Sequence, residues 1–382
     1  MSGTQGPFDL AVVGAGIVGL ASAYAAARAG KHVVVLERDT RANRASIRNF
    51  GFVTVTGQPA GECWRRARRS REVWADVAPQ AGIAVEHRGL VMTVRRSEAK
   101  AVAQAFLATQ MGEGCQWLEP ADLRRQFPDL PLPGEGAVFS PHELRVESRL
   151  AIPQLTAWLA ERWGVVFRMG CAVREVAPPF IDTALGRIEA AAAVVCPGDD
   201  LVTLFPEAIV PHGLTRCRLS MLRLADPGFR LPAAVMSDLG LVRYGGYSAL
   251  PEAGPLRARL EREQGDCLRH GIHLIVVQSA DGSLVVGDSH HNHDTPAPFA
   301  LAEVEDLMLG EFEAALGLPA PPVLERWTGT YASSPTETAI IQTPAPHVRL
   351  AQVTSGTGAS TAFAIGEEII GDLFDLPAGV FA

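Results

Sequence analysis

Two short apolar runs, separated by an alanine-rich segment, dominate the hydrophobic pattern at the start of the chain. Residues 8–13, FDLAVV, and 32–36, HVVVL, have the length and the apolar character of buried strands. The segment between them is rich in alanine up to Ala29 and is followed by Gly30, a residue type that commonly ends a helix. This succession predicts a βαβ unit, in which a helix joins two parallel strands.

Hydrophobic patterning predicts further elements along the chain. Residues 150–162 favour a helix, and the runs VVFRM (165–169) and AAAVV (191–195) favour buried strands. The runs HLIVVQSA and SLVVGDSH flank an Asp281-Gly282 turn, which is a hairpin signal. Near the C-terminus, TSGTGASTAFAIGEE (354–368) is a second glycine-rich turn that leads into an amphipathic helix.

The composition is that of a globular protein. The chain has 382 residues, of which 47% are hydrophobic and 20% charged, so it can bury a large core, and its length favours two linked domains. The net charge of −8 argues against nucleic acid as a partner, because such proteins carry a basic domain or stripe. Outside the glycine-rich first helix, no apolar run reaches about 18 residues, so we expect no membrane association. The start, MSGTQGPFDL, lacks a signal-peptide pattern, which predicts a cytoplasmic location.

The number and spacing of the lysines and cysteines argue against several classes of enzyme and site. Lys31 and Lys100 are the two lysines, and neither lies in a promising motif, which argues against a lysine Schiff-base enzyme. The six cysteines form no C-x-x-C pair and are too scattered for a disulfide framework or a zinc site. We interpret them as small buried hydrophobic residues in a reducing compartment, and we expect no metal.

The turn after the first strand reads Gly14-Ala15-Gly16-Ile17-Val18-Gly19, an intact G-x-G-x-x-G. Gly14 permits the tight turn, Gly16 lets the backbone approach a pyrophosphate, and Gly19 lets the helix lie close to the sheet. The helix N-terminus offers free N–H groups to that pyrophosphate. Glu37, at the end of the second strand, can accept hydrogen bonds from a ribose and would repel the 2′-phosphate of NADP. Dinucleotide binding is therefore predicted, with FAD and NAD both open at this point.

Two later segments favour FAD. The turn at 354–361 supplies a second helix N-terminus, which suits a ligand with phosphates at one end and a polar ring at the other. Residues 191–198, AAAVVCPG, form a buried strand that ends in a Pro-Gly turn, the usual shape of a strand that passes such a cofactor.

Together these motifs resemble the glycine oxidase, sarcosine oxidase and D-amino-acid oxidase superfamily of FAD-dependent oxidoreductases. GAGIVG, SIRNFG, VVCPG and SGTGAST occur in family order along the whole chain. SIRNFGFVTVTGQ, WRRARRSREVW and GIHLIVVQSADGSLVVGDSHH are most similar to a bacterial subgroup associated with aminophosphonate catabolism. The resemblance implies a mixed α/β (α+β) fold: a Rossmann-like FAD-binding domain (1–88, 146–215 and 327–382) interleaved with an antiparallel-sheet substrate domain (89–145 and 216–326).

The resemblance also implies a set of noncovalent FAD contacts. The glycine turn, with Ile17 and Val18, would hold the pyrophosphate, Glu37 the ribose, and Arg38 and Val173 the adenine. The cofactor would also pass Cys196 and Gly198. The segment Ala45, Ser46, Arg48, Asn49, Phe50 and Gly51 would line the path to the flavin, and Gly356, Thr357, Gly358, Ser360 and Thr361 would cradle its pyrimidine end. The alternative for this last group is an ordinary glycine-capped loop.

The segment W-T-G-T-Y (327–331) departs from the family pattern. Amino-acid oxidases of the superfamily typically have G-x-R-P here, with an arginine that binds the α-carboxylate; alignment on Gly329 puts Tyr331 at that position. One tyrosine cannot replace a bidentate arginine, so simple α-amino acids should bind poorly. Tyr331 could instead be a packing residue, with an arginine from elsewhere in its role.

The remaining site residues are expected in the substrate domain. His290 corresponds to a histidine that related enzymes hold beside the flavin, although a surface loop position is the alternative. Arg243 and Tyr247, in the segment RYGGY, would bind the substrate, although Arg243 could equally be a solvated strand residue. His290, Tyr331 and Arg48 are the expected catalytic residues.

The resemblance implies oxidation of a small amine by hydride transfer to flavin N5, with hydrolysis of the imine to an aldehyde. 2-Aminoethylphosphonate or its N-methyl derivative is the expected substrate. A glycine, sarcosine or D-amino-acid oxidase is the first alternative, and a flavin-binding subunit with structural FAD is the second; an NAD-dependent dehydrogenase also stays open. Either O2 or another acceptor would reoxidise the flavin. Some relatives use a lysine near the ring to activate O2, and this chain has few lysines to offer. The sequence does not predict the oligomeric state.

Overall fold

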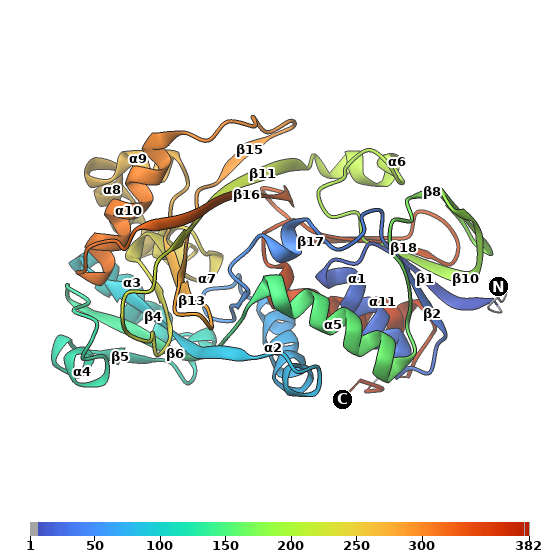
Figure 1. Ribbon diagram of the computed structural model, residues 1–382. Helices are drawn as coiled ribbons and strands as arrows, with labels where there is room; N and C mark the ends of the chain where they lie inside the picture. Colours follow the sequence, from blue (N-terminus) through green and yellow to red (C-terminus); the bar gives the residue numbers. More distant parts are fainter. Residues whose placement is uncertain (1–6, 378, 382) are drawn as a thin grey trace.

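The computed structural model describes residues 7–377 and 379–381, which form two sheets with helices packed around them (Figure 1). Residues 1–6, at the start of the expected first segment and of the stretch examined for a signal peptide, lie outside the described residues, as do 378 and 382. The sheet at the right of Figure 1 carries the N-terminal strand, and the sheet at the left is built mainly from the middle of the chain. The expected mixed α/β fold is confirmed.

The first sheet has the order β17-β18-β10-β1-β2-β7. Its strands are β1 (Phe8–Val13), β2 (Val33–Leu36), β7 (Val166–Arg168), β10 (Gly186–Val195), β17 (Ala339–Gln342) and β18 (Val348–Val353), and β8 (Val173–Ala177) and β9 (Phe180–Thr183) extend it from β10. The run from β18 to β7 is parallel, as the βαβ pattern predicts, with Leu10 opposite Val33 and Ala192. These strands are rich in small and β-branched apolar residues, as expected for a parallel sheet that is buried under helices.

The second sheet has the order β15-β11-β14-β13-β12-β4-β6-β3, with β16 also paired to β11 and β5 to β6. Its strands are β3 (Phe52–Val53), β4 (Val85–Val94), β5 (Gln116–Leu118), β6 (Gly136–Val146), β11 (Thr215–Leu224), β12 (Ala234–Met236), β13 (Ile275–Gln278), β14 (Leu284–Gly287), β15 (His291–His293) and β16 (Val323–Ser333). All pairings are antiparallel except β12 with β4. The hairpin expected around Asp281-Gly282 is β13–β14.

Helices occupy the space around both sheets. They are α1 (Ile17–Arg28), α2 (Glu62–Gln80), α3 (Ser97–Leu107), α4 (Pro120–Gln126), α5 (Ser148–Trp163), α6 (Pro206–Ile209), α7 (Gly245–Ser248), α8 (Ala253–Glu263), α9 (Gly265–Arg269), α10 (Ala302–Leu316) and α11 (Gly358–Leu373). The first and last of these, α1 and α11, pack against each other, so the two ends of the chain meet beside the first sheet. Within the described residues, no helix is long and apolar enough to cross a membrane.

The strand β16 changes the expected domain boundaries. The segment W-T-G-T-Y is not a turn: β16 pairs with β11 from Val323 opposite Leu224 to Ser333 opposite Thr215, so Gly329 lies inside a strand. Residues 327–333 therefore belong to the second sheet, whereas we expected the flavin domain to resume at 327. The end of β6 also pairs within the second sheet, with β3, where Phe52 lies opposite Arg145. A glycine in a strand leaves no sequence signal that separates it from a glycine in a turn.

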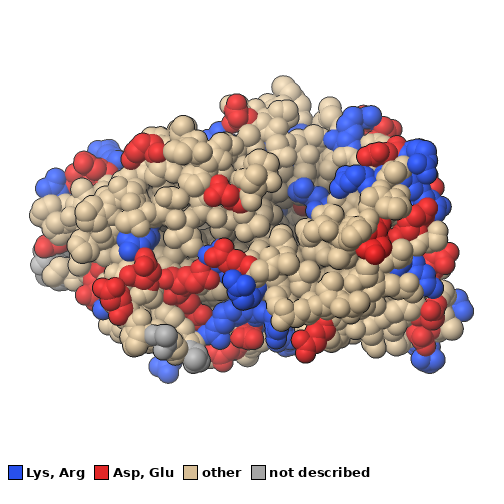
Figure 2. Space-filling model, turned by 180° about the vertical axis from the view of Figure 1, so that it is seen from behind, with Lys and Arg blue, Asp and Glu red and all other residues tan. Residues whose placement is uncertain are grey.

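The surface carries both signs of charge. Figure 2 shows acidic and basic side chains interspersed over one face of the molecule. Many of them form ion pairs, for example Arg69 with Glu367 and Arg66 with Glu368 between α2 and α11. These pairs lie on the helices that close the first sheet.

Candidate active site

A cavity of about 330 Å³ lies where the two sheets meet. From the first sheet it is lined by the start of α1, the end of β18, the turn after β10 and the loop that leads into α11. From the second sheet, β11, β16 and the segments around Arg243, His273 and His290 contribute. Residues 45, 46 and 48–50, between β2 and β3, also line it, as do Phe52, Thr54, Gln58 and Pro59. The cavity thus collects the two glycine turns and the substrate-domain residues that the sequence singles out.

The first glycine turn is held by close backbone packing. Gly14 has φ +105°, and a side chain there would meet the carbonyl oxygen of Cys196 at 2.6 Å. A side chain at Gly19 would come within 1.9 Å of the carbonyl oxygen of Gly14, so α1 can approach the turn because this position is glycine. The carboxylate of Glu37 accepts a hydrogen bond from the Ala15 N–H at 2.9 Å. Glu37 therefore braces the turn, and its contact with a ribose stays a prediction.

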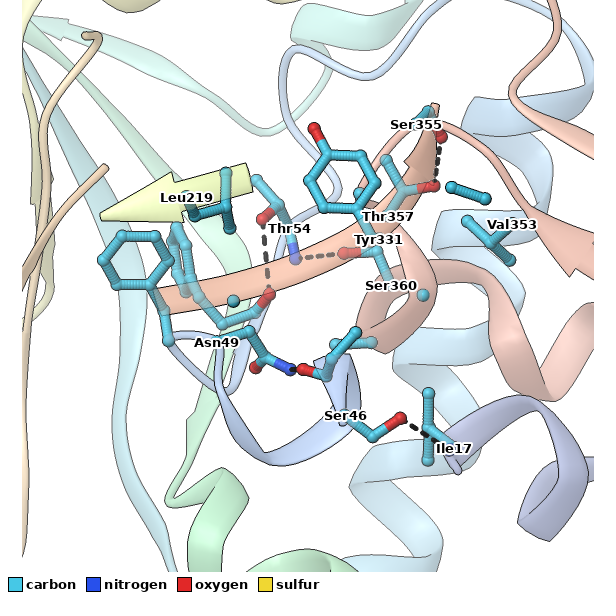
Figure 3. Close-up of a pocket in the computed structure, with 18 of the residues that line it drawn as sticks. Ile17, Ser46, Asn49, Thr54, Leu219, Tyr331, Val353, Ser355, Thr357 and Ser360 are labelled. Carbon is cyan, nitrogen blue, oxygen red and sulfur yellow. Dashed lines mark hydrogen bonds between the residues drawn. The ribbon is translucent and has the colours of Figure 1, made fainter. Parts of the chain in front are cut away.

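The segment from Ala45 to Gly51 crosses the start of α1. The Ser46 hydroxyl accepts a hydrogen bond from the Ile17 N–H at 2.9 Å, and Figure 3 shows these residues side by side. Asn49 fixes the segment from within: its amide donates to the Ala45 carbonyl at 2.7 Å, and its oxygen accepts from the Gly51 N–H at 2.6 Å. Gly51, with φ +65° and the Val146 carbonyl 1.7 Å from its would-be Cβ, serves the backbone turn.

The second glycine turn lies beside the first, since a side chain at Gly358 would meet the Ile17 side chain at 3.6 Å. Gly356 has φ +73°, and a side chain there would meet the ring of Tyr331 at 3.1 Å. The hydroxyl of Ser360 accepts a hydrogen bond from the Thr54 N–H at 2.8 Å, and the Ser355 and Thr357 hydroxyls lie 2.8 Å apart (Figure 3). The start of α11 has no side-chain cap, so its N–H groups are open to an anionic or polar ring atom.

These features fit FAD. At both helix starts that face the cavity, α1 and α11, the N-cap residue provides no side-chain cap, so apart from the Ile17 N–H, which Ser46 accepts, the first N–H groups and the partial positive charge of each helix are available to a ligand. Around them, glycines stand where any side chain would fill the cradle or strike the backbone. A long ligand with a pyrophosphate at one end and a polar ring at the other matches this donor set. Residues 16–19, 45–50 and 356–360 would hold it.

Most of the expected cofactor residues line the cavity. They are Gly16, Ile17, Val18, Gly19, Ala45, Ser46, Arg48, Asn49, Phe50, Cys196, Gly198, Gly356, Thr357, Gly358 and Ser360. Those outside the lining are Gly14, Glu37, Arg38, Gly51, Val173 and Thr361. Arg38 pairs instead with Asp200 at 2.7 Å, and Val173 is buried in β8. The expected adenine contacts of these two residues therefore stay predictions.

The substrate side of the cavity contains Arg243, His290 and Tyr331, three of the four expected residues. Tyr247 is not among the lining residues: it is fully buried and packs against Phe106 with ring centroids 4.6 Å apart. The expectation for Tyr247 is thus corrected, because α7 turns this side chain into the core against α3. Tyr244, three residues earlier, lines the cavity in its place.

Two arginines in the lining have no protein partner. In the part of the chain that the structure describes, neither the Arg243 nor the Arg48 side chain forms a hydrogen bond or an ion pair, whereas most other arginines do. Guanidinium groups that face a cavity without a carboxylate partner are suited to bind an anion. Neither Lys31 nor Lys100 lines the cavity; they lie over the rings of Phe374 and Trp117.

Asp288, His273 and His290 form a buried cluster in the lining. His273 Nε2 lies 3.3 Å from Asp288 Oδ1, and His290 Nε2 lies 3.8 Å from Asp288 Oδ2. Burial and the charge of Arg243 lower the pKa of His273 to about 3 and hold the pKa of His290 well below its usual value. Burial raises the pKa of Asp288 to about 7. Both imidazoles are therefore neutral at pH 7.

Tyr331 lies beside this cluster, with its ring centroid 6.4 Å from that of His290. Burial raises the pKa of the Tyr331 phenol, so it remains a neutral hydrogen-bond donor. Sequence reasoning missed Asp288, His273 and Tyr244. Asp288 lies in the segment G-D-S-H-H, near the histidine that the sequence singled out, and His273 lies just before β13. A signal was therefore present for Asp288, whereas Tyr244 depends on how α7 begins.

Comparisons with known proteins identify the family and the fold of the chain. A sequence model of the DAO family, described as FAD dependent oxidoreductase, matches residues 9–371. A search of curated proteins gave no match. Among solved structures, glycine oxidase from Bacillus cereus superposes with a TM-score of 0.78 at 15% identity, covering 98% of this chain and 100% of that one. L-Proline dehydrogenase from P. horikoshii has a TM-score of 0.77 at 16% identity, covering 97% and 94%.

FAD-bound L-α-glycerophosphate oxidase from Mycoplasma pneumoniae has a TM-score of 0.74 at 13% identity, covering 97% of this chain and 95% of that one. Identities this low show a shared fold alone. The family match, in contrast, spans nearly the whole chain and agrees with the two glycine turns and the cavity between them. The chain is therefore a member of the DAO family of FAD-dependent oxidoreductases.

Proposed function

We propose that this protein oxidises a small amine whose far end carries an anion. The observation that carries the proposal is the unpaired guanidinium of Arg243 in the same cavity as the cofactor cradle. An anionic group on the substrate would give this arginine the partner that the described protein does not supply. Amine and amino-acid chemistry is also named among the similar structures, which include glycine oxidases and L-amino acid deaminases.

The anion is proposed to be a phosphonate, with 2-aminoethylphosphonate or its N-methyl derivative as the substrate. Tyr331 stands where amino-acid oxidases of the family typically have the arginine that binds an α-carboxylate, and it supplies a single neutral donor. A phosphonate has three acceptor oxygens and needs several converging donors. Arg243, Arg48 and Tyr331 all line the cavity and offer such a set. The resemblance of the sequence to the aminophosphonate subgroup supports the same choice.

In this reaction bound FAD would supply a hydride acceptor for the carbon next to the amine nitrogen. The protein's own groups orient the substrate and set its protonation. Tyr331 donates a hydrogen bond from its neutral phenol, and Arg243 and Arg48 neutralise the anion. His290 is held with Nδ1 2.9 Å from the Gly271 carbonyl oxygen, so its Nε2 is left free towards the cavity. Water would then hydrolyse the product imine to an aldehyde, releasing ammonia, or methylamine from the N-methyl derivative.

We propose that FAD is bound noncovalently and that the reduced flavin passes its electrons either to O2 or to another acceptor. Cys196 is the one cysteine among the described lining residues, and burial raises its pKa to about 12, so it stays an unreactive thiol. No lysine lines the described cavity, which favours slow reaction with O2 and a dehydrogenase that uses a different acceptor.

An amino-acid oxidase is the second candidate, because two of the similar structures are glycine oxidases. A protein in which FAD is structural is the third. Anaerobic reduction of the bound flavin, followed by its absorbance, separates the three. 2-Aminoethylphosphonate and its N-methyl derivative should bleach the flavin faster than glycine, sarcosine or D-alanine. Faster bleaching by an amino acid would replace the phosphonate assignment, and a flavin that no amine reduces would refute an amine oxidoreductase.

A further inference from the structure

The cluster of Asp288, His273 and His290 contains an excess of hydrogen-bond acceptors. His290 Nδ1 lies 2.9 Å from the Gly271 carbonyl oxygen, which can only accept, so this nitrogen carries the ring hydrogen and Nε2 has a lone pair. His273 Nδ1 lies 3.5 Å from the same oxygen, and its Nε2 lies 3.0 Å from the Tyr244 hydroxyl, which can donate to it. His290 Nε2 is therefore the imidazole acceptor that is left free beside Asp288.

The two carboxylate oxygens of Asp288 are acceptors as well, and the free imidazole nitrogen beside them offers no hydrogen-bond donor. Its side chain is 7% exposed, and Oδ1 has no hydrogen-bond partner within the described residues. A buried carboxylate oxygen without a donor is costly, because the lost hydration is not replaced. The cluster therefore calls for a ligand that brings hydrogen-bond donors into the cavity.

A substrate ammonium group meets this requirement. It has three N–H donors and a positive charge, which suits a carboxylate flanked by neutral imidazoles. One ligand atom from each of Asp288, His273 and His290 lies within 4.8 Å of the other two. A nitrogen about 2.8 Å from each of its acceptors lets those acceptors lie up to roughly 4.8 Å apart, so one ammonium group can reach Asp288 and His290 together.

We propose that Asp288, with His273 and His290 beside it, binds the ammonium end of the substrate and takes one of its protons. This inference rests on the proposed amine substrate and deepens it. The step is balanced: R–NH3⁺ and the Asp288 carboxylate become R–NH2 and the Asp288 carboxylic acid. The nitrogen lone pair released in this way is needed before a hydride can leave the neighbouring carbon. Arg243, in the same cavity, would be neutralised by the substrate anion, so the two ends of the substrate bind cooperatively.

The surroundings of Asp288 set the pH range. It is faced by His290 on its own segment, His273 from the residues just before β13, Arg243 and Tyr244 from the segment before α7, Cys217 of β11 and Tyr331 of β16. Burial raises its pKa to about 7, and Arg243 opposes that rise. Below about pH 7 the carboxyl group is neutral and cannot take a proton, and above it the carboxylate can. Activity should thus rise through about pH 7, whereas a substrate amine stays charged up to about pH 10.

The test compares the wild type with Asp288→Asn, using the flavin-loaded protein. The matched control is Asp294→Asn, which removes the same charge from an exposed loop position outside the cavity lining. For the amine that reduces the flavin fastest, kcat/KM of Asp288→Asn should fall by about 10²- to 10⁴-fold. The rise of kcat/KM near pH 7 should disappear in this variant. Instead, kcat/KM should rise as the pH approaches the pKa of the free amine. A purely structural role of Asp288 would lower activity without moving the profile.

A binding measurement keeps the inference separate from the proposed substrate. The probe is tert-butylamine, which has no hydrogen on the carbon next to nitrogen, with tert-butanol as the neutral control. Calorimetry in two buffers of different ionisation enthalpy should show release of about one proton on amine binding at pH 6 and none at pH 8.5. This result requires the wild type alone, so it stands even if Asp288→Asn does not fold. It also stands if no amine reduces the flavin, in which case only the proposed function fails.

Three results would overturn the inference. The first is an absence of tert-butylamine binding, or binding with the same proton balance at both pH values. The second is an Asp288→Asn variant that keeps the wild-type pH profile. The third is a stoichiometric metal ion in the purified protein that His290→Asn removes, since these three residues would then be metal ligands.

Discussion

Replacing Arg243 by alanine tests the proposed anion site most directly. The guanidinium has no hydrogen bond or ion pair in the described structure, so its removal leaves no buried protein group without a partner. The full effect should therefore appear in ligand binding, and the melting temperature should stay unchanged. Loss of a hydrogen bond to a charged group costs about 1.5–3 kcal/mol. This corresponds to a roughly 10- to 150-fold weaker affinity for a phosphonate.

The assay is titration of the flavin absorbance with ethylphosphonate, which has the anion but no amine to oxidise. Arg243→Ala should raise its Kd at least tenfold, with Arg243→Lys between the two because an ammonium group keeps the charge and loses the bidentate geometry. The matched control is Arg262→Ala, which removes an exposed arginine from α8, outside the lining. Flavin content should be equal in all four proteins.

Arg243→Ala also changes the pH dependence of activity. The Arg243 charge lowers the pKa of Asp288, so the alanine variant should carry a higher Asp288 pKa and show its activity rise at a higher pH. An ethylphosphonate Kd within a factor of about two of the wild-type value would refute the anion site. A lost flavin or a lowered melting temperature would show that Arg243 has a structural role instead.

Three further predictions concern the cofactor and the core. Gly19→Val should abolish flavin binding, because its Cβ would lie 1.9 Å from the Gly14 carbonyl oxygen; a yellow variant with normal flavin absorbance would contradict the proposed cradle. Acid precipitation should release all the yellow colour into the supernatant, and colour that stays in the pellet would disprove noncovalent attachment. Asp238→Ala should lower the free energy of unfolding by about 3–5 kcal/mol in urea titrations, because it leaves Arg95 and Arg96 without their shared, fully buried carboxylate; a loss under about 1 kcal/mol would show that Glu311 compensates.

Local sequence signals predicted the first sheet better than the domain boundaries. The βαβ unit follows from contiguous residues, with Gly30 marking the end of α1 and short apolar runs forming β1 and β2. Both glycine turns were also visible, because a positive φ or a close backbone approach requires glycine. The pairing of β16 with β11 was not predicted, because it depends on residues about a hundred positions away, and the domain boundary expected at 327 stays a prediction.

The site residues also include some that the sequence predicted and others that depend on tertiary packing. Arg243, His290 and Tyr331 were singled out and line the cavity. Tyr247 was also expected there but is buried in the core, and Tyr244 lines the cavity instead. Nothing in the segment RYGGY indicates which tyrosine meets the core, since that depends on the packing of α7 against α3. Asp288 had a sequence signal in G-D-S-H-H, but its approach to His273 did not, because the start of β13 and the end of β14 come together only when the hairpin pairs.

The cofactor cradle is built from both ends of the chain, and this has a consequence for synthesis. β1 pairs with β10, β10 pairs with β18, and α1 packs against α11. A ribosome releases the first glycine turn at the start and the second only after more than nine-tenths of the chain. The nascent protein must therefore hold a half-built nucleotide site, with an exposed apolar strand edge, until α11 emerges. FAD capture therefore has to wait until α11 has been synthesised and has packed against α1, and FAD present at that moment stabilises the closed site by mass action.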